Sequence, residues 1–433
     1  MKFQISNKTF YSRHSKEISR FVSKNQSLHI VNAKSKYKIN ESVTTDILYL
    51  EIEKIEAENL IIDKKYDVII LTDIVEVHPD IFNFFKLLSK FLNDNGKLVI
   101  TSFNSKYKII IKILERLKLK DKTLKYSYIH NDKINNIISG NGFDYINSFS
   151  KQILPFKLFG LGTLLNRILE SLFFFFNLGI KTYSIYRLKG KEFQNYKKTI
   201  IIPAKNEEGN LENIIDRIPK VEKYEIIIPC GISEDNTVNV AKMISDSEDY
   251  FQVTSFIQSG KGKANAVWEA IQKSSGDVLA ILDADISVDP ETIPDFFEII
   301  DSNNADFVNG TRLIYQMEKG AMRYINHLGN RLFQFFVGGI VSYPLTDSLC
   351  GTKVFKRELY DDLIWWQKKL KYSDPFGDFD LIFTAAFTGR KIIEYPIHYR
   401  SRTYGSTQIS RFKDGFKLIK YLIYSFFVFR TSS

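Results

Sequence analysis

The chain has 433 residues, which is long enough for two or three domains of ordinary size and favours two. Hydrophobic residues make up 44%, charged residues 25% and aromatic residues 14%, so a disordered, collagen-like or low-complexity protein is excluded. The net charge of +10 is divided unevenly, with +14 in residues 1–200, −10 in residues 201–390 and +6 in residues 391–433. Because no zinc-finger, RRM or helix-turn-helix signature accompanies this charge, we expect no nucleic-acid partner.

The cysteine content and the length of the apolar stretches indicate in which cellular compartment the protein resides. The two cysteines, Cys230 and Cys350, cannot form a disulfide framework or a four-cysteine zinc site, so we expect reduced, buried thiols. No signal peptide is recognised at the N-terminus. The longest apolar stretches, residues 171–180 and 421–429, have about half the length of a membrane-spanning helix. We expect a cytoplasmic protein, and peripheral attachment to the inner face of the cell membrane stays open.

The first part of the chain, residues 1–190, contains apolar runs that predict strands. Residues 66–73 and 96–102 are typical of buried strands, and residues 81–91 have the pattern of an amphipathic helix. Residues 191–198 are polar and rich in lysine, so we predict that they form a linker between two domains.

The second part, predicted to form one domain over residues 199–411, repeats this alternation. Short apolar runs and helical patterns follow one another at residues 199–203, 210–218, 224–229, 264–273 and 278–282. Strands that alternate with helices on both sides of the linker predict two α/β domains with parallel sheets. Ligands of such sheets bind at the carboxyl ends of the strands.

Two carboxylates stand at the end of one predicted strand. Asp283 and Asp285 directly follow the apolar run 278–282. Because Mg²⁺ and Mn²⁺ prefer oxygen ligands and also bind phosphate oxygens, this pair can hold a divalent cation against a phosphate group. A turn that uses the aspartates for local hydrogen bonds is the alternative.

Four segments in this part of the chain carry a family resemblance. They are Ile201 to Leu211, Tyr224 to Thr237, Gly260 to Ala266 and Ser275 to Asp285. In this order and spacing they closely resemble the family 2 glycosyltransferases of GT-A fold, especially the branch of polyprenyl-phosphate sugar transferases. The resemblance covers roughly Lys198 to Ile419. It implies a Rossmann-like, three-layer α/β domain.

The resemblance also implies roles for single residues. Asp283 and Asp285 would be the metal ligands, with Mg²⁺ or Mn²⁺ as cofactor. The residues matched to the nucleotide-sugar site are Pro203, Asn206, Glu207, Asp235, Lys261, Lys263 and Asp283. For Lys261 and Lys263 a role as solvated surface charges stays open.

One segment departs from the family pattern. Where most members have Asp-Asp-Gly-Ser, this chain has Cys230-Gly231-Ile232-Ser233. The carboxylates that usually contact the base are therefore missing, and we do not predict which base is bound. Nothing in the nearby sequence would activate Cys230, so we expect it to be a packed thiol.

Three aspartates are the candidates for the catalytic role. Asp347 lies in a segment, residues 346–355, that resembles the acceptor side of the family. Asp378 and Asp380 lie where inverting members keep the general base. A single displacement with inversion needs one carboxylate to take the acceptor's proton. If the acceptor is a phosphate anion, Asp378 or Asp380 would only position the acceptor or the metal.

The C-terminal part of the sequence is basic. The candidates for a phosphate or acceptor clamp are His398, Arg400, Arg402 and Arg411, because guanidinium groups pair with phosphate. A solvated charged surface is the alternative. Residues 412–433 mix lysines with aromatic and aliphatic residues, which suits an amphipathic helix on an anionic membrane, and packing against the protein's own core is equally open.

Residues 66–78 and 91–101 resemble the central and later motifs of class I S-adenosylmethionine-dependent methyltransferases, and the match spans about Ser27 to Leu188. The stretch that corresponds to the cofactor loop, Ser27 to Tyr37, contains no glycine, and side chains there would crowd the cofactor. We therefore expect a degenerate domain that does not bind S-adenosylmethionine and serves as a scaffold or recognises the acceptor. Glu76 and His78 are either catalytic or ordinary residues after a strand, and we favour the second interpretation.

Together these features predict an inverting glycosyltransferase. It would move a sugar from a nucleotide-sugar donor, with a divalent metal, to a lipid-phosphate or glycan acceptor at the membrane surface. One alternative is a bifunctional enzyme that also methylates. A second alternative is a non-catalytic nucleotide- or glycan-binding protein. The missing carboxylates of the Asp-Asp-Gly-Ser segment favour this alternative.

Overall fold

A computed structural model describes the chain in two compact units. The described residues are 7–22, 26–33, 46–50, 64–108, 113, 116, 131–154, 161–173, 176–190, 193–315, 317–318, 324–402, 404 and 411–431. The first unit comprises Met1–Lys191 together with Phe429–Ser433, and the second comprises Glu192–Val428. Each is described here by itself.

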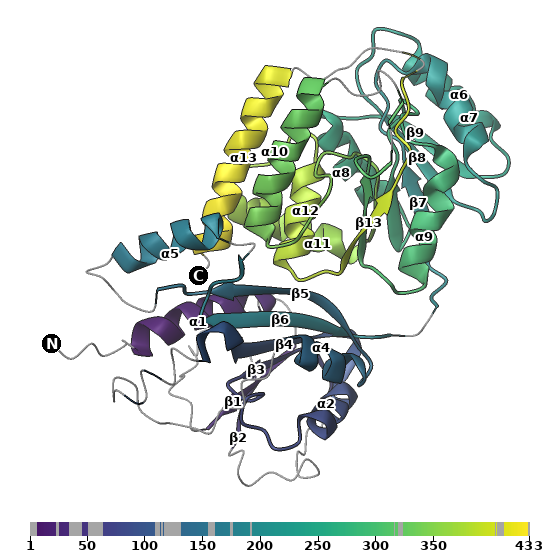
Figure 1. The fold of residues 1–433 in the computed structure, drawn as a ribbon. Coiled ribbons are helices and arrows are strands. Elements are labelled where there is room, and N and C mark those ends of the chain that lie inside the picture. Colours follow the sequence, from purple (N-terminus) through teal and green to yellow (C-terminus); the bar gives the residue numbers. More distant parts are fainter. Residues whose placement is uncertain are drawn as a thin grey trace. The chain divides into compact units, whose positions relative to one another are not determined.

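The first unit is built on a six-stranded sheet (Figure 1). Its elements are α1 (Asn7–Val22), β1 (Ser27–Asn32), β2 (Asp46–Leu50), β3 (Tyr66–Thr72), α2 (Ile81–Lys90), β4 (Leu92–Phe103), the 3₁₀ helix η3 (Ser105–Tyr107), α4 (Asn131–Ser139), β5 (Phe143–Lys151), α5 (Leu161–Leu172) and β6 (Lys181–Leu188). The strand order is β2-β1-β3-β4-β6-β5. Strands β1 to β4 are parallel, and β6 runs antiparallel to both β4 and β5.

Helices cover both faces of this sheet, because the central strands are apolar on both sides. On β3, Val68 and Ile70 pack with the apolar residues of α1, whereas Ile69 and Leu71 pack with those of α2 and α4. This alternation follows from the two-residue period of a strand. The first unit is therefore a three-layer α/β unit.

The second unit is built on a seven-stranded sheet (Figure 1). Its elements are β7 (Lys198–Ile201), α6 (Glu208–Arg217), β8 (Glu225–Cys230), α7 (Thr237–Ser247), β9 (Gln252–Ile257), α8 (Lys263–Lys273), β10 (Val278–Ile281), the 3₁₀ helix η6 (Pro290–Thr292), α9 (Ile293–Asp301), β11 (Phe307–Thr311), α10 (Tyr324–Val341), β12 (Lys353–Lys356), α11 (Glu358–Leu370), α12 (Asp378–Phe387), β13 (Ile392–Pro396) and α13 (Arg411–Thr431). The strand order is β13-β11-β12-β10-β7-β8-β9. Only β12 runs antiparallel to its neighbours among these strands.

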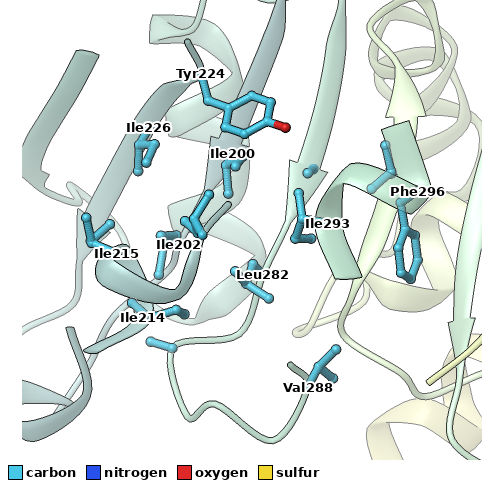
Figure 2. Packing of buried hydrophobic residues seen from close by; sticks show 14 of the residues in the cluster. Ile200, Ile202, Ile214, Ile215, Tyr224, Ile226, Leu282, Val288, Ile293 and Phe296 are labelled. Carbon is cyan, nitrogen blue, oxygen red and sulfur yellow. The ribbon is translucent and has the colours of Figure 1, made fainter. Parts of the chain in front are cut away.

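The core of the second unit lies between the sheet and helices α6, α7 and α9. Figure 2 shows Ile200, Ile202 and Ile226 from the strands packed with Ile214 and Ile293 from the helices. Helix α8 contacts β7 and β8 and buries its own apolar side chains. The central strands β7, β8 and β10 are buried along their whole length.

The topology also points to one edge of this sheet. The chain runs from β7 outward through β8 to β9, and then returns to place β10 on the other side of β7. The direction of winding therefore reverses between β7 and β10. In doubly wound sheets, ligands bind in the crevice outside the carboxyl ends of the strands at such a reversal.

The predicted fold class is confirmed, with one correction. Both units are α/β, and the predicted strands and helices lie within a few residues of the observed ones. The sheets are mixed rather than purely parallel, because β6 and β12 are antiparallel. Among the described residues, no helix is both long enough and apolar enough to cross a membrane.

Candidate functional site

Charged side chains gather where the winding of the second sheet reverses. Asp283 and Asp285 follow β10, and Glu207 follows β7, its parallel neighbour. Parallel neighbours end at the same edge of a sheet, so three residues that are distant in sequence meet in one place. Asp283 and Asp285 also influence the pKa of Glu207, as expected of neighbouring carboxylates. We call this group the acidic cluster.

Asp283 is paired with Lys263 at the beginning of α8. Their side chains are 28% and 22% exposed, so both reach the surface of the crevice. Burial alone would raise the pKa of Asp283, but Lys263, and after it Lys353 and Arg402, lower it below its usual value. Asp283 is therefore ionised and carries a cationic partner.

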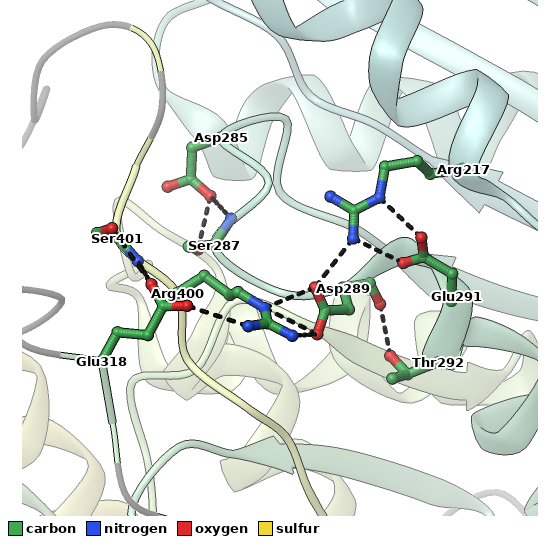
Figure 3. A network of polar contacts seen from close by, with 9 residues as sticks. All are labelled: Arg217, Asp285, Ser287, Asp289, Glu291, Thr292, Glu318, Arg400 and Ser401. Carbon is green, nitrogen blue, oxygen red and sulfur yellow. Dashed lines mark hydrogen bonds and ion pairs between the residues drawn. The ribbon is translucent and has the colours of Figure 1, made fainter.

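Asp285 is more deeply buried and has two kinds of partner. Its Oδ1 accepts hydrogen bonds from the Ser287 backbone N–H at 3.0 Å and from the Ser287 hydroxyl at 2.6 Å (Figure 3). Its Oδ2 lies 2.6 Å from Arg402. The first contacts fix the carboxylate, and the second balances its charge.

Glu207 completes the acidic cluster from the side of β7. Its Oε2 accepts a hydrogen bond from Asn210 at 2.6 Å. Burial raises the pKa of Glu207 to about 7, and the nearby Asp285 adds to this effect. Two of these carboxylates are paired with a cation, Asp283 with Lys263 and Asp285 with Arg402.

Gly351 and Lys353 lie against the same cluster from the antiparallel strand β12 and the turn before it. A Cβ atom on Gly351 would overlap the carboxylate of Asp283 and the ammonium of Lys263, so a larger residue would displace both side chains. Lys353 is fully buried and its Nζ lies 3.0 Å from Oδ1 of Asp378, the first residue of α12. Asp378 also acts on the pKa of Lys263, which places it beside the cluster.

Replacing Gly351 with alanine should displace the Asp283 and Lys263 side chains. We expect turnover to fall roughly 10- to 100-fold, because small displacements of a reacting group have effects of this size. The matched control is Gly415→Ala, where a Cβ atom meets nothing within 4 Å. Steady-state kinetics of both variants checks this expectation, and equal turnover of Gly351→Ala and the wild type would contradict it.

The turn after β7 is held by the segment after β8. The Asn206 backbone adopts a positive φ of 55°, and its side chain accepts a hydrogen bond from the Glu234 N–H at 2.8 Å. Asp235 accepts hydrogen bonds from the Thr237 N–H and the Glu208 N–H, at 3.1 and 3.3 Å. Pro203 follows β7 and is partly exposed. These contacts give Asn206 and Asp235 a structural task at the rim of the crevice.

Asp380 lies deeper than its neighbour Asp378. It is fully buried, and its Oδ1 accepts a hydrogen bond from the hydroxyl of Tyr421 at 2.6 Å. Its Oδ2 accepts from Gln367 at 2.8 Å and from the Asp374 N–H at 3.3 Å. A carboxylate held in this way favours the positioning role, one of the two interpretations that the sequence leaves open for Asp380.

Asp374 is a buried acid that the sequence did not single out. Burial, followed by the charges of Asp378 and Asp380, raises the pKa of Asp374 to about 8. The unfolded value is roughly 3.9. Between about pH 4 and pH 8 the folded state therefore keeps a proton that the unfolded chain has released, and this group lowers the stability as the pH rises.

Replacing Asp374 with asparagine removes this titration. We expect the melting temperature of Asp374→Asn to fall less than that of the wild type between about pH 5 and pH 8. All three tryptophans, Trp268, Trp365 and Trp366, belong to the second unit, so their fluorescence follows its unfolding. The exposed Asp216→Asn is the control. The same slope in wild type and Asp374→Asn would refute the assignment.

Asp347 has a buried ion pair of its own. It accepts two hydrogen bonds from the guanidinium of Arg312, at 2.7 and 3.0 Å, and a third from Asn330 at 3.0 Å. Its side chain is fully buried. The Arg312 side chain in turn lies over the ring of Tyr399. This geometry gives Asp347 a supporting position, in which it fixes the Arg312 loop.

The predicted phosphate clamp is not assembled as one group. Arg402 reaches the acidic cluster, whereas Arg400 binds Asp289 and Glu318 (Figure 3). Asp289 also binds Arg217, so these charges form a network on the rim. His398 is stacked on Tyr315, with ring centroids 4.5 Å apart. The exposed Lys261 lies on the turn before α8, and the side chain of Arg411 is outside the described residues.

Both cysteines are packed thiols. Cys230 ends β8 and Cys350 precedes β12, and both are buried without a disulfide bond. Burial raises the pKa of Cys230 to about 11 and that of Cys350 to about 12. Neither is a nucleophile at neutral pH, as expected from the sequence.

In the first unit, Glu76 and His78 make local contacts. Glu76 is buried and its Oε1 accepts a hydrogen bond from the Phe103 N–H at 2.6 Å. The Nδ1 of His78 accepts a hydrogen bond from the Asp80 N–H at 3.1 Å, and its ring stacks on Phe84. These contacts favour the interpretation of both as ordinary residues after a strand.

Several site residues were not predicted because their partners are remote in the sequence. Gly351 and Lys353 lie in the segment 346–355, in which the sequence predicted only Asp347 as a candidate residue. Gly351 stands out as a glycine directly before a strand, but nothing in the sequence shows that it lies against Asp283. Arg312 and Tyr421 carry no signal at all, since each acts on a carboxylate 35 or 41 residues away.

The donor set is suitable for a divalent cation. Asp283 and Asp285 offer carboxylate oxygens at the mouth of the crevice, and the charges that balance them belong to side chains that a cation can displace. Among the described residues, no group of three or more His, Cys, Asp or Glu side chains is placed to hold a metal ion. Mg²⁺ is commonly bound by one or two carboxylates together with substrate phosphates and water, so two ligands suffice.

Comparisons with known proteins place this site in a family. Residues 199–364 match the model of the family described as glycosyl transferase family 2. A curated relative, the low-salt glycan biosynthesis hexosyltransferase Agl6 of Haloferax volcanii, is 25% identical over 230 residues. The match covers 52% of this chain and 52% of the relative, so it spans about half the length of each protein. Residues 199–364 of the second unit are thus similar to a family 2 glycosyltransferase domain.

Two solved structures are similar to parts of this chain. The glucosyl-3-phosphoglycerate synthase of Mycobacterium tuberculosis, in complex with Mn²⁺, UDP and phosphoglyceric acid, is 18% identical, with a TM-score of 0.40 over 54% of this chain and 79% of its own. The mannosyltransferase PcManGT of Pyrobaculum calidifontis, in complex with GDP-Man and Mn²⁺, is 15% identical, with a TM-score of 0.37 over 54% and 63%. Similarities of this size do not define a substrate.

Proposed function

We propose that the second unit transfers a sugar from a nucleotide-diphosphate donor to an acceptor, with the aid of a divalent cation and with inversion at the sugar carbon. The observation that carries the proposal is the acidic cluster at the reversal of the sheet, where Asp283 and Asp285 lie beside Glu207. This is where a doubly wound sheet binds its ligand. The family match over residues 199–364 supports the same reaction class.

Asp283 and Asp285 would hold Mg²⁺ or Mn²⁺, and the bound cation would supply charge to the departing diphosphate. In this arrangement the carboxylates exchange their present partners for the cation. Lys263 and Arg402, released from Asp283 and Asp285, are then available to phosphate oxygens. The same two cations therefore balance the carboxylates in one state and the donor in the other.

Asp378 is the candidate for the general base. Its side chain is 12% exposed, and its Oδ1 lies 3.0 Å from the ammonium of the buried Lys353. With a hydroxyl acceptor, Asp378 would take the proton as the new glycosidic bond forms. With a phosphate acceptor it would only orient that group. A loss of turnover in Asp378→Asn with hydroxyl acceptors alone would separate the two roles.

The acceptor we favour is a lipid phosphate or a glycan carried on a lipid. Helices α10 and α13 both pack on α12, because Phe379 of α12 contacts Phe333 of α10 and Tyr421 of α13. Both helices carry exposed apolar side chains, which are Leu328, Leu332, Phe335 and Phe336 on α10 and Phe416, Ile419, Ile423 and Phe427 on α13. Exposed apolar side chains of this kind on the catalytic unit suit an acceptor that is presented in a membrane.

For the first unit we propose that it does not bind S-adenosylmethionine. The winding of its sheet reverses between β1 and β3, which is the corresponding ligand position. There, His29 of β1 lies 2.8 Å from the hydroxyl of Thr72, and Lys181 pairs with Asp73. His14 of α1 reaches the same hydroxyl at 3.2 Å. All of these side chains are buried, so the chain's own residues fill the position.

Calorimetric titration of the full chain with S-adenosylmethionine tests this part of the proposal. We expect no heat of binding, because Lys181 and the histidines would have to leave their partners. Saturable binding at micromolar concentration would overturn it, and would favour the bifunctional alternative.

The transfer reaction is tested by a screen of nucleotide sugars. The protein is incubated with UDP- and GDP-sugars, Mn²⁺ or Mg²⁺ and a polyprenyl phosphate, and the released nucleoside diphosphate is measured. We expect release with at least one donor, dependent on metal and acceptor. If no donor is consumed and no nucleotide raises the melting temperature in the presence of Mn²⁺, the proposed reaction is wrong.

A further inference from the structure

The helix α5 in the first unit has its apolar face turned outward. Its exposed side chains are Leu161, Leu164, Leu165, Ile168 and Leu172, with exposed fractions of 37% to 64%. These positions have the spacing of one face of a helix. A helix on a globular protein normally buries such a face, so α5 is inverted relative to the usual arrangement.

The opposite, polar face of α5 is the one that packs on the protein. Asn166 exchanges two hydrogen bonds with the backbone of Leu154, both at 2.7 Å, and Glu170 accepts one from the Gln152 N–H at 2.6 Å. Lys151 lies 3.8 Å from Glu170. Because these contacts fix the rotation of the helix about its axis, the outward direction of the leucines is built into the fold.

The apolar face continues past the end of α5. Phe173 and Phe176 are 40% and 60% exposed, and the chain between residues 176 and 179 is held in place by the segment after β4. Asn104 donates to the carbonyls of Asn177 and Gly179, at 2.7 and 2.9 Å. The exposed Lys106 donates to the carbonyl of Phe176 at 2.5 Å. A positive charge therefore stands at the edge of the apolar face.

More positive charge follows in the sequence. Residues 104–130 contain eight Lys or Arg and two Asp or Glu, and residues 1–200 carry a net charge of +14. With twelve residues, α5 is too short to span a bilayer. Leucine and phenylalanine on one side and lysine beside them are the composition of helices that lie in the plane of an anionic membrane surface.

We propose that α5, together with Phe173 and Phe176, is a membrane-binding surface, and that its partner is a bilayer rich in anionic lipid. The apolar face enters the boundary between headgroups and acyl chains, and Lys106 contacts the phosphates. The first unit then acts as a membrane anchor in place of a methyltransferase. This inference is independent of the transfer reaction, since it needs neither donor nor acceptor.

Co-sedimentation of the full chain with vesicles tests the proposal. One set of vesicles contains phosphatidylglycerol and phosphatidylcholine in equal parts, and the other contains phosphatidylcholine alone. We expect binding to the first set, weakened at high salt because the charges are screened. The double variant Leu164→Glu and Ile168→Glu should bind about 100-fold more weakly. Two apolar side chains that would be buried in the bilayer are lost, and two negative charges are added.

The matched control is the double variant Val221→Glu and Met243→Glu, which changes two side chains of the second unit that are 67% and 61% exposed. It carries the same added charge and should bind like the wild type. A third variant, Phe416→Glu with Ile423→Glu, reports on α13. If binding is lost only in this third variant, or is unchanged in the α5 variant, the proposal is wrong.

A protein partner gives a different result. If a second copy of the chain covers α5, the wild type will sediment as a dimer without lipid and the α5 variant as a monomer. Analytical ultracentrifugation at the concentrations of the vesicle assay shows this directly. Such a dimer, with no binding to either set of vesicles, would overturn the membrane assignment.

Discussion

Replacing Asp285 with asparagine is expected to lower turnover by at least about 100-fold at saturating donor and Mn²⁺. Asparagine keeps the shape of the side chain and can still accept the hydrogen bonds from Ser287, so the loop should stay folded. The substitution removes the charge that would hold the cation and that now holds Arg402. Release of nucleoside diphosphate measures the effect.

The control for this variant is Asp289→Asn. Asp289 lies four residues further along the chain and binds Arg217 and Arg400 on the rim, away from the acidic cluster. We expect it to keep turnover within a few fold of the wild type. Equal activity of Asp285→Asn and the wild type would remove the metal from the proposed mechanism, while leaving the domain assignment untouched.

Replacing Arg312 with methionine is expected to lower the free energy of unfolding of the second unit by about 3 to 5 kcal/mol. Methionine cannot pair with Asp347, which is fully buried and would then carry a charge with a single side-chain donor, Asn330. Urea unfolding followed by tryptophan fluorescence measures the loss, because all three tryptophans lie in this unit.

Two further variants show that the effect comes from the unpaired charge. Arg217→Met breaks the ion pairs with Glu291, which is 49% exposed, and with Asp289, which keeps Arg400 as a partner. It should cost less than about 1 kcal/mol. The double variant Arg312→Met and Asp347→Leu removes both charges and should recover part of the lost stability. If Arg312→Met unfolds at the same urea concentration as Arg217→Met, the ion pair does not support the unit.

The positions of the strands could be predicted well where a residue pattern is typical of a single kind of element. The apolar runs of β3, β7 and β10 could only be buried strands, and the aspartates after β10 mark its carboxyl end. The direction of β6 and β12 could not be predicted, because a buried strand has the same apolar residue pattern whether its neighbours are parallel or antiparallel. The start of β4 at Leu92 was missed because Asn95 and Gly96 resemble a turn.

The candidate site was predicted in part for a related reason. Residues that end a strand, such as Asp283 and Glu207, meet because of the topology, and the topology follows from the order of the strands. The pairs Lys353–Asp378 and Arg312–Asp347 depend instead on how loops and helices close over the sheet. The sequence offers no rule for such contacts, and it therefore could not distinguish Asp378, whose side chain is 12% exposed, from Asp380, which is fully buried.

The hydrogen bond from Tyr421 to Asp380 has a practical consequence for work on this protein. The family match ends at residue 364, and a fragment designed from it would lack Asp378, Arg402 and all of α13. Even a fragment ending at residue 411 would leave the buried Asp380 without its hydroxyl donor and expose Trp366, which donates to Tyr421. Helix α13 is thus part of the core of the second unit, and expression trials should retain it.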